Sequence, residues 1–393
     1  MKSLIFIISL TTIFLFSGCA TKEKVVPQEQ KTEEPLKDTP KENLKNMQAV
    51  GFNEIEGFYN DDLEHALNVF KKDCQKSKRN ELFKEVCQKA EYETDGRKFF
   101  TINFQPYKLL DDNFSDEGTI TGYYEPLLYG SLKKNKRYKY PVYKTPKDMM
   151  VIDLVSAYPE LKSYKFRGKL VGNKVVPYDS RAEIERNPSK NLEVIAYVDN
   201  KVDLFLLHVQ GSGKILLDSG ELINVGYAEQ NGRKFKGIGT YMLNRGYISK
   251  DELSAQGMKK YLDKNPSKAD EVLNQNESYV FFHKSEQGAT GSLGTQLTAK
   301  RNLAVDRSVI PLGTPVFLST KNPIDKKPIN QLMVAADVGG AIKGDIRADF
   351  FWGYGEDAFA YAGRMKEKGK MYVLMPKNSC CLHATTISTA VRF

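Results

Sequence analysis

Short apolar segments follow one another closely after about residue 118, and they constrain the fold more than any other feature of the sequence. Many of them alternate polar with apolar positions, and Gly or Pro flanks several. Strands are therefore expected over residues 119–124, 140–143, 194–198, 204–209, 214–217, 278–282, 315–318, 333–336 and 371–374. Short strands at close spacing predict a β-barrel or a β-sandwich, in a chain that is mainly β with some helices.

Helical spacing of apolar residues is confined to three regions. Residues 61–90 predict a helical pair, and residues 238–265 predict two more helices with Gly246 as a stop between them. Residues 356–368 predict a last helix, because acidic residues lead it and lysines end it. With 393 residues, of which 41% are hydrophobic, the chain is long enough for one large domain or two ordinary ones.

The start of the chain has the order of an export signal. Lys2 precedes an uncharged apolar run over residues 4–16, and Ser17-Gly18-Cys19-Ala20 follows it. The run is too short to span a bilayer comfortably, and its end resembles the bacterial lipoprotein box. We therefore expect a signal peptide over residues 1–18 and a lipid on Cys19, with an ordinary signal or a short anchor as the alternative.

The segment behind this signal has the composition of a tether. Residues 21–46 are rich in Lys, Glu, Pro, Gln and Thr, and such a segment cannot bury enough apolar surface to order itself. We expect a flexible tether over 19–46 and a folded body from near Ala49. Ala20 stands where an acid would favour inner-membrane retention in some bacteria, so the periplasmic face of the outer membrane of a Gram-negative bacterium is the expected location.

The remaining four cysteines and four histidines do not have the spacing of metal ligands. No Cys-x-x-Cys occurs and the histidines are scattered singly, so we expect neither a metal nor a cofactor. On one continuous helix Cys74 and Cys87 would lie about 20 Å apart, so a disulfide between them requires a turn near residues 77–80. Two free, half-buried thiols are the alternative. No role follows for Cys380 and Cys381.

Charge and aromatic content limit the classes of partner. The net charge is +9, but no basic run is long enough to indicate a nucleic-acid footprint, and no nucleic acid is expected. Aromatic residues make up 11% of the chain and are almost all Tyr and Phe. Side chains of this kind line the surfaces that hold sugar polymers.

Three stretches combine Gly with acids, hydroxyls and amides: residues 121–126, 210–213 and 336–355. In the third, an apolar strand leads to Asp337, and Asp349 follows beside three aromatic residues. A carboxyl group in such surroundings should have a raised pKa and could protonate a glycosidic oxygen. A surface position for Asp349, and a turn role for Asp337 bonded to its own backbone, are the plainer alternatives.

Together these stretches resemble the membrane-bound lytic murein transglycosylase A family. The matching motifs occur in order between about residues 50 and 375, at 121–124, 140–143, 180–184, 210–213, 226–232, 276–282, 303–307 and 311–313. The C-terminal part resembles the three-aspartate domain, with Asp306, Asp337 and Asp349 as its aspartates. Glu125 is not universal in the family, and the Cys380-Cys381 tail matches nothing in it.

The resemblance implies a double-psi β-barrel catalytic domain over 47–125 and 268–393, interrupted by an inserted substrate-binding β-barrel over 126–267, with a groove between them. It implies cleavage of the β-1,4 bond between N-acetylmuramic acid and N-acetylglucosamine in peptidoglycan, with formation of 1,6-anhydromuramic acid. Asp349 would be the single acid and base. The other residues of the implied site are Thr121, Tyr124, Gln210, Asp306, Asp337 and Lys343. Implied partners are glycan strands, the membrane through the lipid, and complexes of cell-wall synthesis or division.

Other functions stay open. Asp337 and Asp349 could be the two carboxylates of a hydrolysing glycosidase. A peptidoglycan-binding lipoprotein without activity would fit if Arg347 held Asp349 ionised. An aspartic protease would need a second Asp-x-Gly loop, which residues 306–308 do not supply.

Overall fold

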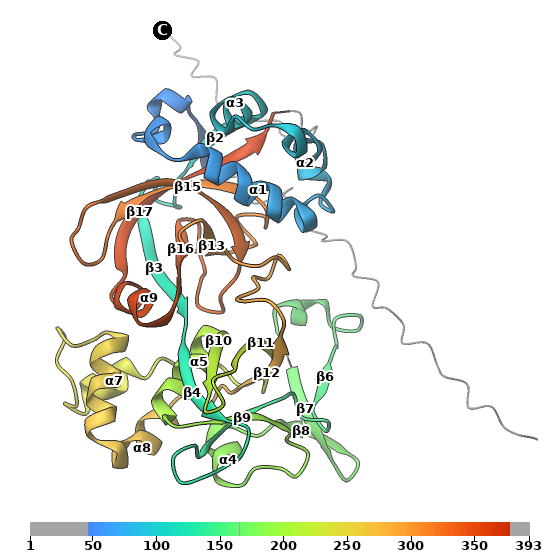
Figure 1. Ribbon diagram of the computed structural model, residues 1–393. Helices are drawn as coiled ribbons and strands as arrows, with labels where there is room; N and C mark the ends of the chain where they lie inside the picture. Colours follow the sequence, from blue (N-terminus) through green and yellow to red (C-terminus); the bar gives the residue numbers. More distant parts are fainter. Residues whose placement is uncertain (1–45, 165, 378–393) are drawn as a thin grey trace, which may run out of the picture. The chain divides into compact units, whose positions relative to one another are not determined.

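The structure, a computed structural model, describes residues 46–164 and 166–377 (Figure 1). The expected signal peptide, the lipidated Cys19 with its tether to residue 45, and the Cys380-Cys381 pair lie outside the described residues. Within the described ranges, no helix is both long and apolar enough to cross a membrane.

Three helices near the start of the body cover part of a β-barrel. They are α1 (Leu63–Ser77), α2 (Glu81–Tyr92) and α3 (Gly96–Asn103), so the helical pair expected over 61–90 is confirmed. Each starts at a side chain that accepts a hydrogen bond from a backbone N–H of its first turn: Asp62, Asn80 and Asp95. Their apolar faces pack on Phe317, Leu332, Val334 and Leu374 of the barrel, and Figure 1 shows α1 lying against β15.

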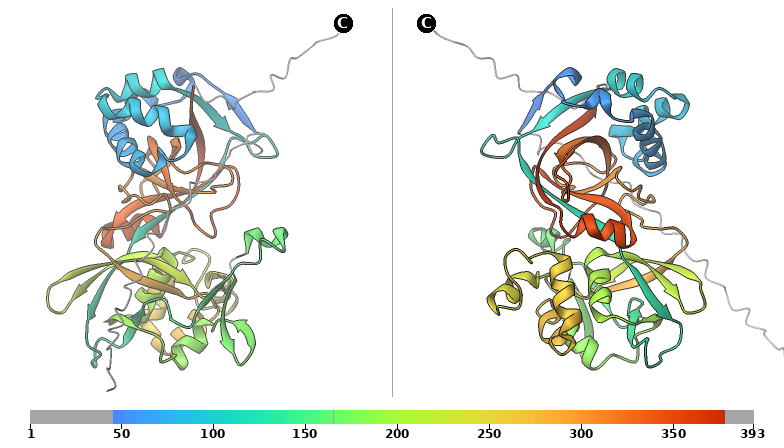
Figure 2. Two further views of the ribbon diagram at one scale, coloured as in Figure 1. Left: turned by 90° about the vertical axis from the view of Figure 1, so that its right-hand side faces the viewer. Right: turned by 60° about the vertical axis from the view of Figure 1, so that its left-hand side comes forward.

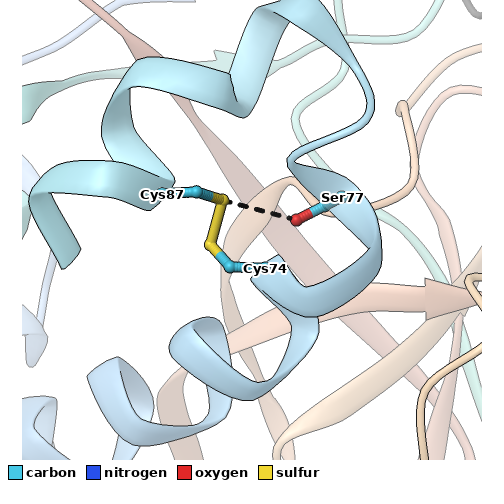
Figure 3. The surroundings of a disulfide bond; sticks show 3 residues. All are labelled: Cys74, Ser77 and Cys87. Atoms are coloured by element: carbon cyan, nitrogen blue, oxygen red, sulfur yellow. Dashed lines mark hydrogen bonds between the residues drawn. A yellow bond between two sulfur atoms is a disulfide. The ribbon is translucent and has the colours of Figure 1, made fainter. Parts of the chain in front are cut away.

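A disulfide joins α1 to α2. The turn at residues 78–80 reverses the chain, and the Cα atoms of Cys74 and Cys87 are 5.5 Å apart (Figure 3). The Ser77 hydroxyl lies 3.7 Å from the Cys87 sulfur. The turn is therefore at the place that a bridge between these cysteines requires.

Eight strands form the larger sheet, and six of them close a barrel. The strand order is β1-β2-β17-β14-β15-β13-β16-β3, and β3 also pairs with β17. The cycle β3-β17-β14-β15-β13-β16 is thus complete, with antiparallel pairs except β15–β13 and β16–β3. A closed six-stranded barrel agrees with the expected fold class, whereas the double-psi connection pattern stays a prediction. The strand bounds are β1 Met47–Ala49, β2 Phe104–Leu109, β3 Gly118–Glu125, β13 Asn302–Val305, β14 Pro315–Lys321, β15 Pro328–Asp337, β16 Arg347–Tyr354 and β17 Lys366–Pro376.

A second sheet is inserted between β3 and β13. Its order is β12-β11-β10-β4-β9-β5, and its edge strands β12 and β5 also contact each other, so the sheet curls back on itself. The chain passes from the barrel into this sheet between Glu125 and Leu127, and Figure 2 shows β3 running on into β4. The bounds are β4 Leu127–Ser131, β5 Tyr140–Tyr143, β9 Val194–Val198, β10 Ser212–Leu217, β11 Leu222–Gln230 and β12 Val280–Ser285.

Smaller elements surround the second sheet. A three-stranded sheet is formed by β6 (Met150–Ile152), β7 (Phe166–Val171) and β8 (Lys174–Pro177). The helices are α4 (Arg181–Arg186), α5 (Lys201–Gln210), α6 (Gly239–Asn244), α7 (Ala255–Lys264) and α8 (Ala269–Leu273), followed by α9 (Gly355–Ala362) beside the barrel. Short 3₁₀ turns occupy Phe52–Glu54, Phe58–Asn60, Pro159–Ser163 and Pro266–Lys268.

The strand expected over 204–209 is wrong, because these residues belong to helix α5. Asn200 accepts hydrogen bonds from the N–H groups of Val202 and Asp203, and Gly211 ends the helix at φ +82°. Five consecutive side chains from Leu204 to His208 are buried. An apolar run that is buried on every side carries no periodicity, so periodicity could not separate helix from strand.

One expectation about the C-terminal part needs correction. The helix expected over 356–368 ends at Ala362, because Lys366, Glu367 and Lys368 pair with strand β3 as the start of β17. This pairing partner is remote in sequence. Strand β12 forms an antiparallel ladder with β11, and the bounds of the two domains stay a prediction.

Removing the disulfide should destabilise the body. The crosslink spans a sequence separation of 13, and restricting a loop of this size in the unfolded chain is worth about 3 kcal/mol. The variant Cys74→Ala with Cys87→Ala should lose about that much free energy of unfolding, measured by urea denaturation with the fluorescence of Trp352. Reductant should lower the free energy of unfolding of the parent by a similar amount and leave that of the variant unchanged. Equal urea midpoints of the parent with and without reductant would contradict the expectation.

Candidate active site

The centre of the site is a contact between two parallel strands of the barrel. Asp349 on β16 lies opposite Thr121 on β3 in the register of the ladder. The Thr121 hydroxyl donates a hydrogen bond of 2.6 Å to Asp349 Oδ1, and Arg347 Nη2 donates one of 2.9 Å to the same hydroxyl oxygen. The threonine is therefore a bridge between a cation and a half-buried carboxyl group.

Asp337, the second carboxyl group, lies at the end of β15. Its Oδ1 accepts hydrogen bonds from the Ser292 N–H (2.9 Å), the Ser292 hydroxyl (2.8 Å) and the Val338 N–H (2.8 Å). The bond from Val338 is the turn role that the sequence left open, and the bonds from Ser292 add a partner from another loop. Three donors on one oxygen favour an ionised carboxylate.

A small residue separates the two aspartates. Ala304 on β13 is the register partner of Asp337 on one side and of Asp349 on the other. Two strand spacings place the aspartate Cα atoms about 10 Å apart, within the reach of facing side chains. A methyl side chain at the intervening position leaves room for both carboxyl groups.

The electrostatics give the two carboxyl groups different tasks. Burial and, to a lesser degree, the charge of Asp337 raise the pKa of Asp349 to about 6, against the hydrogen bond from Thr121 and the attraction of Arg347. Burial also raises the pKa of Asp337, while its donors from Ser292 and Val338 act in the opposite direction. The three donors favour negative charge on Asp337, and a pKa of about 6 lets Asp349 hold or release a proton close to neutral pH. The attraction of Arg347 lowers the pKa of Asp349 but does not outweigh the effect of burial.

Tyr123 adds a buried hydroxyl group to this cluster. Burial raises the pKa of Tyr123 well above its usual value, and the charges of Asp337 and Asp349 raise it further. Its buried hydroxyl lies close enough to Asp337 for a hydrogen bond between them to contribute to the pKa shifts of both groups. A neutral O–H donor is thus held beside the two carboxyl groups.

Gln210 and Tyr124 connect the insert to the barrel beside this cluster. Gln210 Oε1 accepts a hydrogen bond of 3.1 Å from the Tyr124 N–H, which ties the last residue of α5 to β3. The Tyr124 side chain is only 6% exposed, and its ring stacks on Phe359 at 5.1 Å. It is packed in the core next to the site, and a contact between Tyr124 and the substrate stays a prediction.

Asp306 and Lys343 form a neighbouring group. Asp306 is buried and accepts hydrogen bonds from Ser308, from the Gly344 N–H at 3.1 Å and from Lys343 Nζ at 3.3 Å. Burial acts to raise the pKa of Asp306, but these partners outweigh it and the pKa lies below its usual value. Asp306 thus anchors the loop that precedes β16, and Lys343 remains exposed above it.

Ser292 is the site residue that the sequence reasoning missed. It lies in Gly288–Gly294, where three glycines surround a threonine and a serine. This is the same density of Gly and hydroxyl residues that singled out the other three stretches, so the signal was available. Among the described residues, no group of three or more His, Cys, Asp or Glu side chains is arranged to hold a metal ion.

Comparison with known proteins finds two family domains. The MltA specific insert domain matches residues 119–283, and the 3D domain matches residues 301–375. Membrane-bound lytic murein transglycosylase A of Escherichia coli K12 is 31% identical over 271 residues, which cover 67% of each chain. The crystal structure of MltA from Neisseria gonorrhoeae is 32% identical, with a TM-score of 0.77 over 85% of this chain and 93% of that one. The membrane-bound lytic murein transglycosylase from Agrobacterium tumefaciens is 29% identical, with a TM-score of 0.75 over 84% and 98%.

Replacing Ser292 should change how the two carboxyl groups share a proton. Ser292→Ala removes one donor from Asp337, so the pKa of Asp337 should rise and the pKa of Asp349 should fall. The two values are measured by carbon-13 NMR titration of the side-chain carboxyl groups. Ser292→Thr keeps a hydroxyl group and should restore the parent values, and identical titrations of the parent and Ser292→Ala would refute the assigned role.

Ionisation of the buried Asp349 carboxyl group should also lower the free energy of unfolding at neutral pH. Its folded pKa is about 6, above the unfolded value, so stability is fully present below about pH 4 and is lost as pH rises through about 6. Asp349→Asn cannot ionise, so its free energy of unfolding relative to the parent should increase from acidic to neutral pH. Urea denaturation of both proteins across this range measures the difference. A difference that does not vary with pH would show that ionisation of Asp349 carries no cost.

Proposed function

Since the chain belongs to the membrane-bound lytic murein transglycosylase A family and is a peptidoglycan lytic transglycosylase, we propose that Asp349 is its single acid and base. The observation that carries the proposal is the raised pKa of Asp349 beside an Asp337 carboxylate that accepts three hydrogen bonds. A carboxyl group whose pKa lies close to the working pH can give a proton to a glycosidic oxygen and then take one back.

The reaction begins with proton transfer from Asp349 to the oxygen between N-acetylmuramic acid and N-acetylglucosamine. The bond from this oxygen to C1 of the muramic acid breaks, and positive charge develops at C1 and the ring oxygen. The Asp349 carboxylate then takes the proton of the C6 hydroxyl group, whose oxygen forms a bond to C1. The products are a 1,6-anhydromuramic acid end and a free N-acetylglucosamine hydroxyl, and no water is consumed.

The surrounding residues support these two proton transfers. Asp337 supplies a fixed negative charge near the developing cation, which is stabilised most in the transition state. Thr121 and Arg347 orient the Asp349 carboxyl group through their chain of hydrogen bonds. The nucleophile belongs to the same sugar as the reacting carbon, so no second carboxyl group has to activate it.

We assign catalysis to the barrel and substrate binding to the inserted sheet, with the glycan in a groove between them. Thr121, Asp337 and Asp349 come from the barrel, and Gln210 from the insert is bonded to β3 beside them. Lys343 is exposed beside Asp306, where it can contact the substrate, while Tyr124 and Asp306 act from buried positions.

We place the enzyme at the periplasmic face of the outer membrane, anchored through a lipid on Cys19. The support is the order of the leader, with a short apolar run, two small residues and a cysteine. A flexible tether with the composition of residues 21–46 would let the body reach glycan strands some tens of ångströms from the membrane. Complexes of cell-wall synthesis or division are the protein partners that this position would allow.

The proposal is tested by incubating the full chain with purified peptidoglycan and determining the masses of the released muropeptides. The parent should release products that are about 18 Da lighter than hydrolysed ones, because no water is added. Asp349→Asn should release essentially none, whereas Asp251→Asn, which changes an exposed aspartate elsewhere, should match the parent. Hydrated products would indicate the two-carboxylate hydrolase, and no release by the parent would leave a binding lipoprotein.

A further inference from the structure

A cavity of about 690 Å³ lies in the insert, away from the two aspartates. Strands β6–β8 form one wall, and the segments around residues 232–236 and 274–277 form the other. Its lining comprises Ile152, Phe166, Arg167, Val175, Val176, Pro177, Gly232, Arg233, Lys234, Lys236, Asn274, Gln275 and Glu277. Asp337 and Asp349 are on barrel strands that contribute none of these residues.

The charge of the lining is strongly positive. Arg167 is paired with Glu229 at 2.9 Å, and the guanidinium of Arg233 reaches Glu277 only at 3.9 Å. Lys234 and Lys236 are exposed and form no ion pair with any residue that the structure describes. An excess of positive charge in a concave site raises the local concentration of anionic ligands.

Hydrogen bonds hold the cationic segment in place. Gly232 has φ +77°, and a Cβ atom there would lie 2.9 Å from Arg167, so the backbone approaches β7 as only glycine allows. Arg233 Nε donates to the Tyr178 carbonyl at 2.9 Å, and the Lys236 N–H donates to Asn276 Oδ1 at 3.2 Å. The cations are therefore presented on a fixed backbone.

Two buried polar atoms in the lining lack a hydrogen-bond partner among the described residues. They are Arg167 Nε, a donor, and Asn274 Oδ1, an acceptor. A buried polar atom without a partner is costly, and a bound ligand is one way to satisfy it. A peptide group offers the matching pair, a carbonyl oxygen for the arginine and an N–H for the asparagine.

The remaining wall is apolar. Ile152, Phe166, Val175, Val176 and Pro177 present aliphatic and aromatic surface to the cavity. The ligand class is therefore a short chain of small, apolar residues with amide groups and free carboxylates. A neutral sugar polymer offers no charge to the lysines, and a flat membrane surface does not enter a cavity.

We propose that this cavity binds the carboxylate-bearing peptide that hangs from the muramic acid of the substrate. The inference rests on the proposed function, since it assigns a second contact with the same polymer. The peptide site fixes the position of the glycan strand through its side chain while the barrel cleaves the strand itself. The enzyme then acts faster on strands that carry peptides than on bare glycan of equal length.

The test compares Lys234→Glu with Lys236→Glu against a matched pair, Lys134→Glu with Lys136→Glu, in the full chain. The control has the same spacing and the same change of charge on an exposed loop outside the cavity. Turnover is measured on peptide-bearing strands and on strands from which an amidase has removed the peptides. Binding of a disaccharide-tetrapeptide and of the peptide-free disaccharide is measured by calorimetry.

The cavity variant should lose at least about threefold in turnover on peptide-bearing strands and keep parental turnover on bare strands. Only the peptide carries carboxylates away from the glycan and into the cavity, whereas the lactyl carboxylate that the amidase leaves sits directly on the muramic acid. Its binding of the disaccharide-tetrapeptide should weaken equally, and the control should match the parent on every probe. Equal losses on both strand types, or none, would overturn the proposal, and so would weakened binding to anionic lipid vesicles with unchanged peptide binding. A parent that cleaves neither strand type would refute the proposed function, while the calorimetry would still decide the peptide site.

Discussion

The pairing of β3 along both of its edges is the constraint on which the rest of the structure depends. One edge is hydrogen-bonded to β16 and the other to β17, which closes the barrel. Closure leaves no barrel strand with an unpaired edge, and it buries the apolar side chains of the core. The same strand sets Thr121 against Asp349 and continues into the inserted sheet. Loss of this pairing would open the barrel, dissolve the carboxyl cluster and detach the insert together.

The carboxyl cluster costs free energy within this barrel. Burial raises the pKa of both Asp337 and Asp349, so ionising either costs free energy. Three donors place the charge on Asp337, and the like charge then favours a proton on Asp349. A chain selected for stability alone would place apolar side chains here. The cluster persists because the neighbouring strands β15, β13, β16 and β3 of the closed barrel hold its residues in register, and sites of this kind retain groups that weaken the fold.

Elements that depend on interactions between residues near in sequence were predicted correctly, and elements that depend on remote contacts were not. Local signals predicted the helical pair over 61–90 and strands such as 140–143 and 194–198, since caps and alternation act within a few residues. The segment 204–209 became a helix because it is buried on all sides and carries no period. Lys366–Lys368 left the expected helix because β3 needed a partner. Ser292 lies in a stretch as rich in Gly and hydroxyl residues as the three predicted ones. Its role was nevertheless not predicted, because its hydrogen bond to Asp337 joins residues 45 positions apart.

The sequence by itself determined the mainly β class, the identity of the aspartates and the turn that a bridge between Cys74 and Cys87 requires. Each follows from composition, from motif order or from the rise of a helix, and none needs the path of the whole chain. Only the tertiary structure decided that the pKa of Asp349 lies near 6, because that value depends on burial, on the hydrogen bond from β3 and on the nearby charge of Asp337. It also brought together the cationic cavity, whose lining comes from segments more than a hundred residues apart. Electrostatic free energies depend on distance and solvent in space, and a linear sequence specifies neither until the chain has folded.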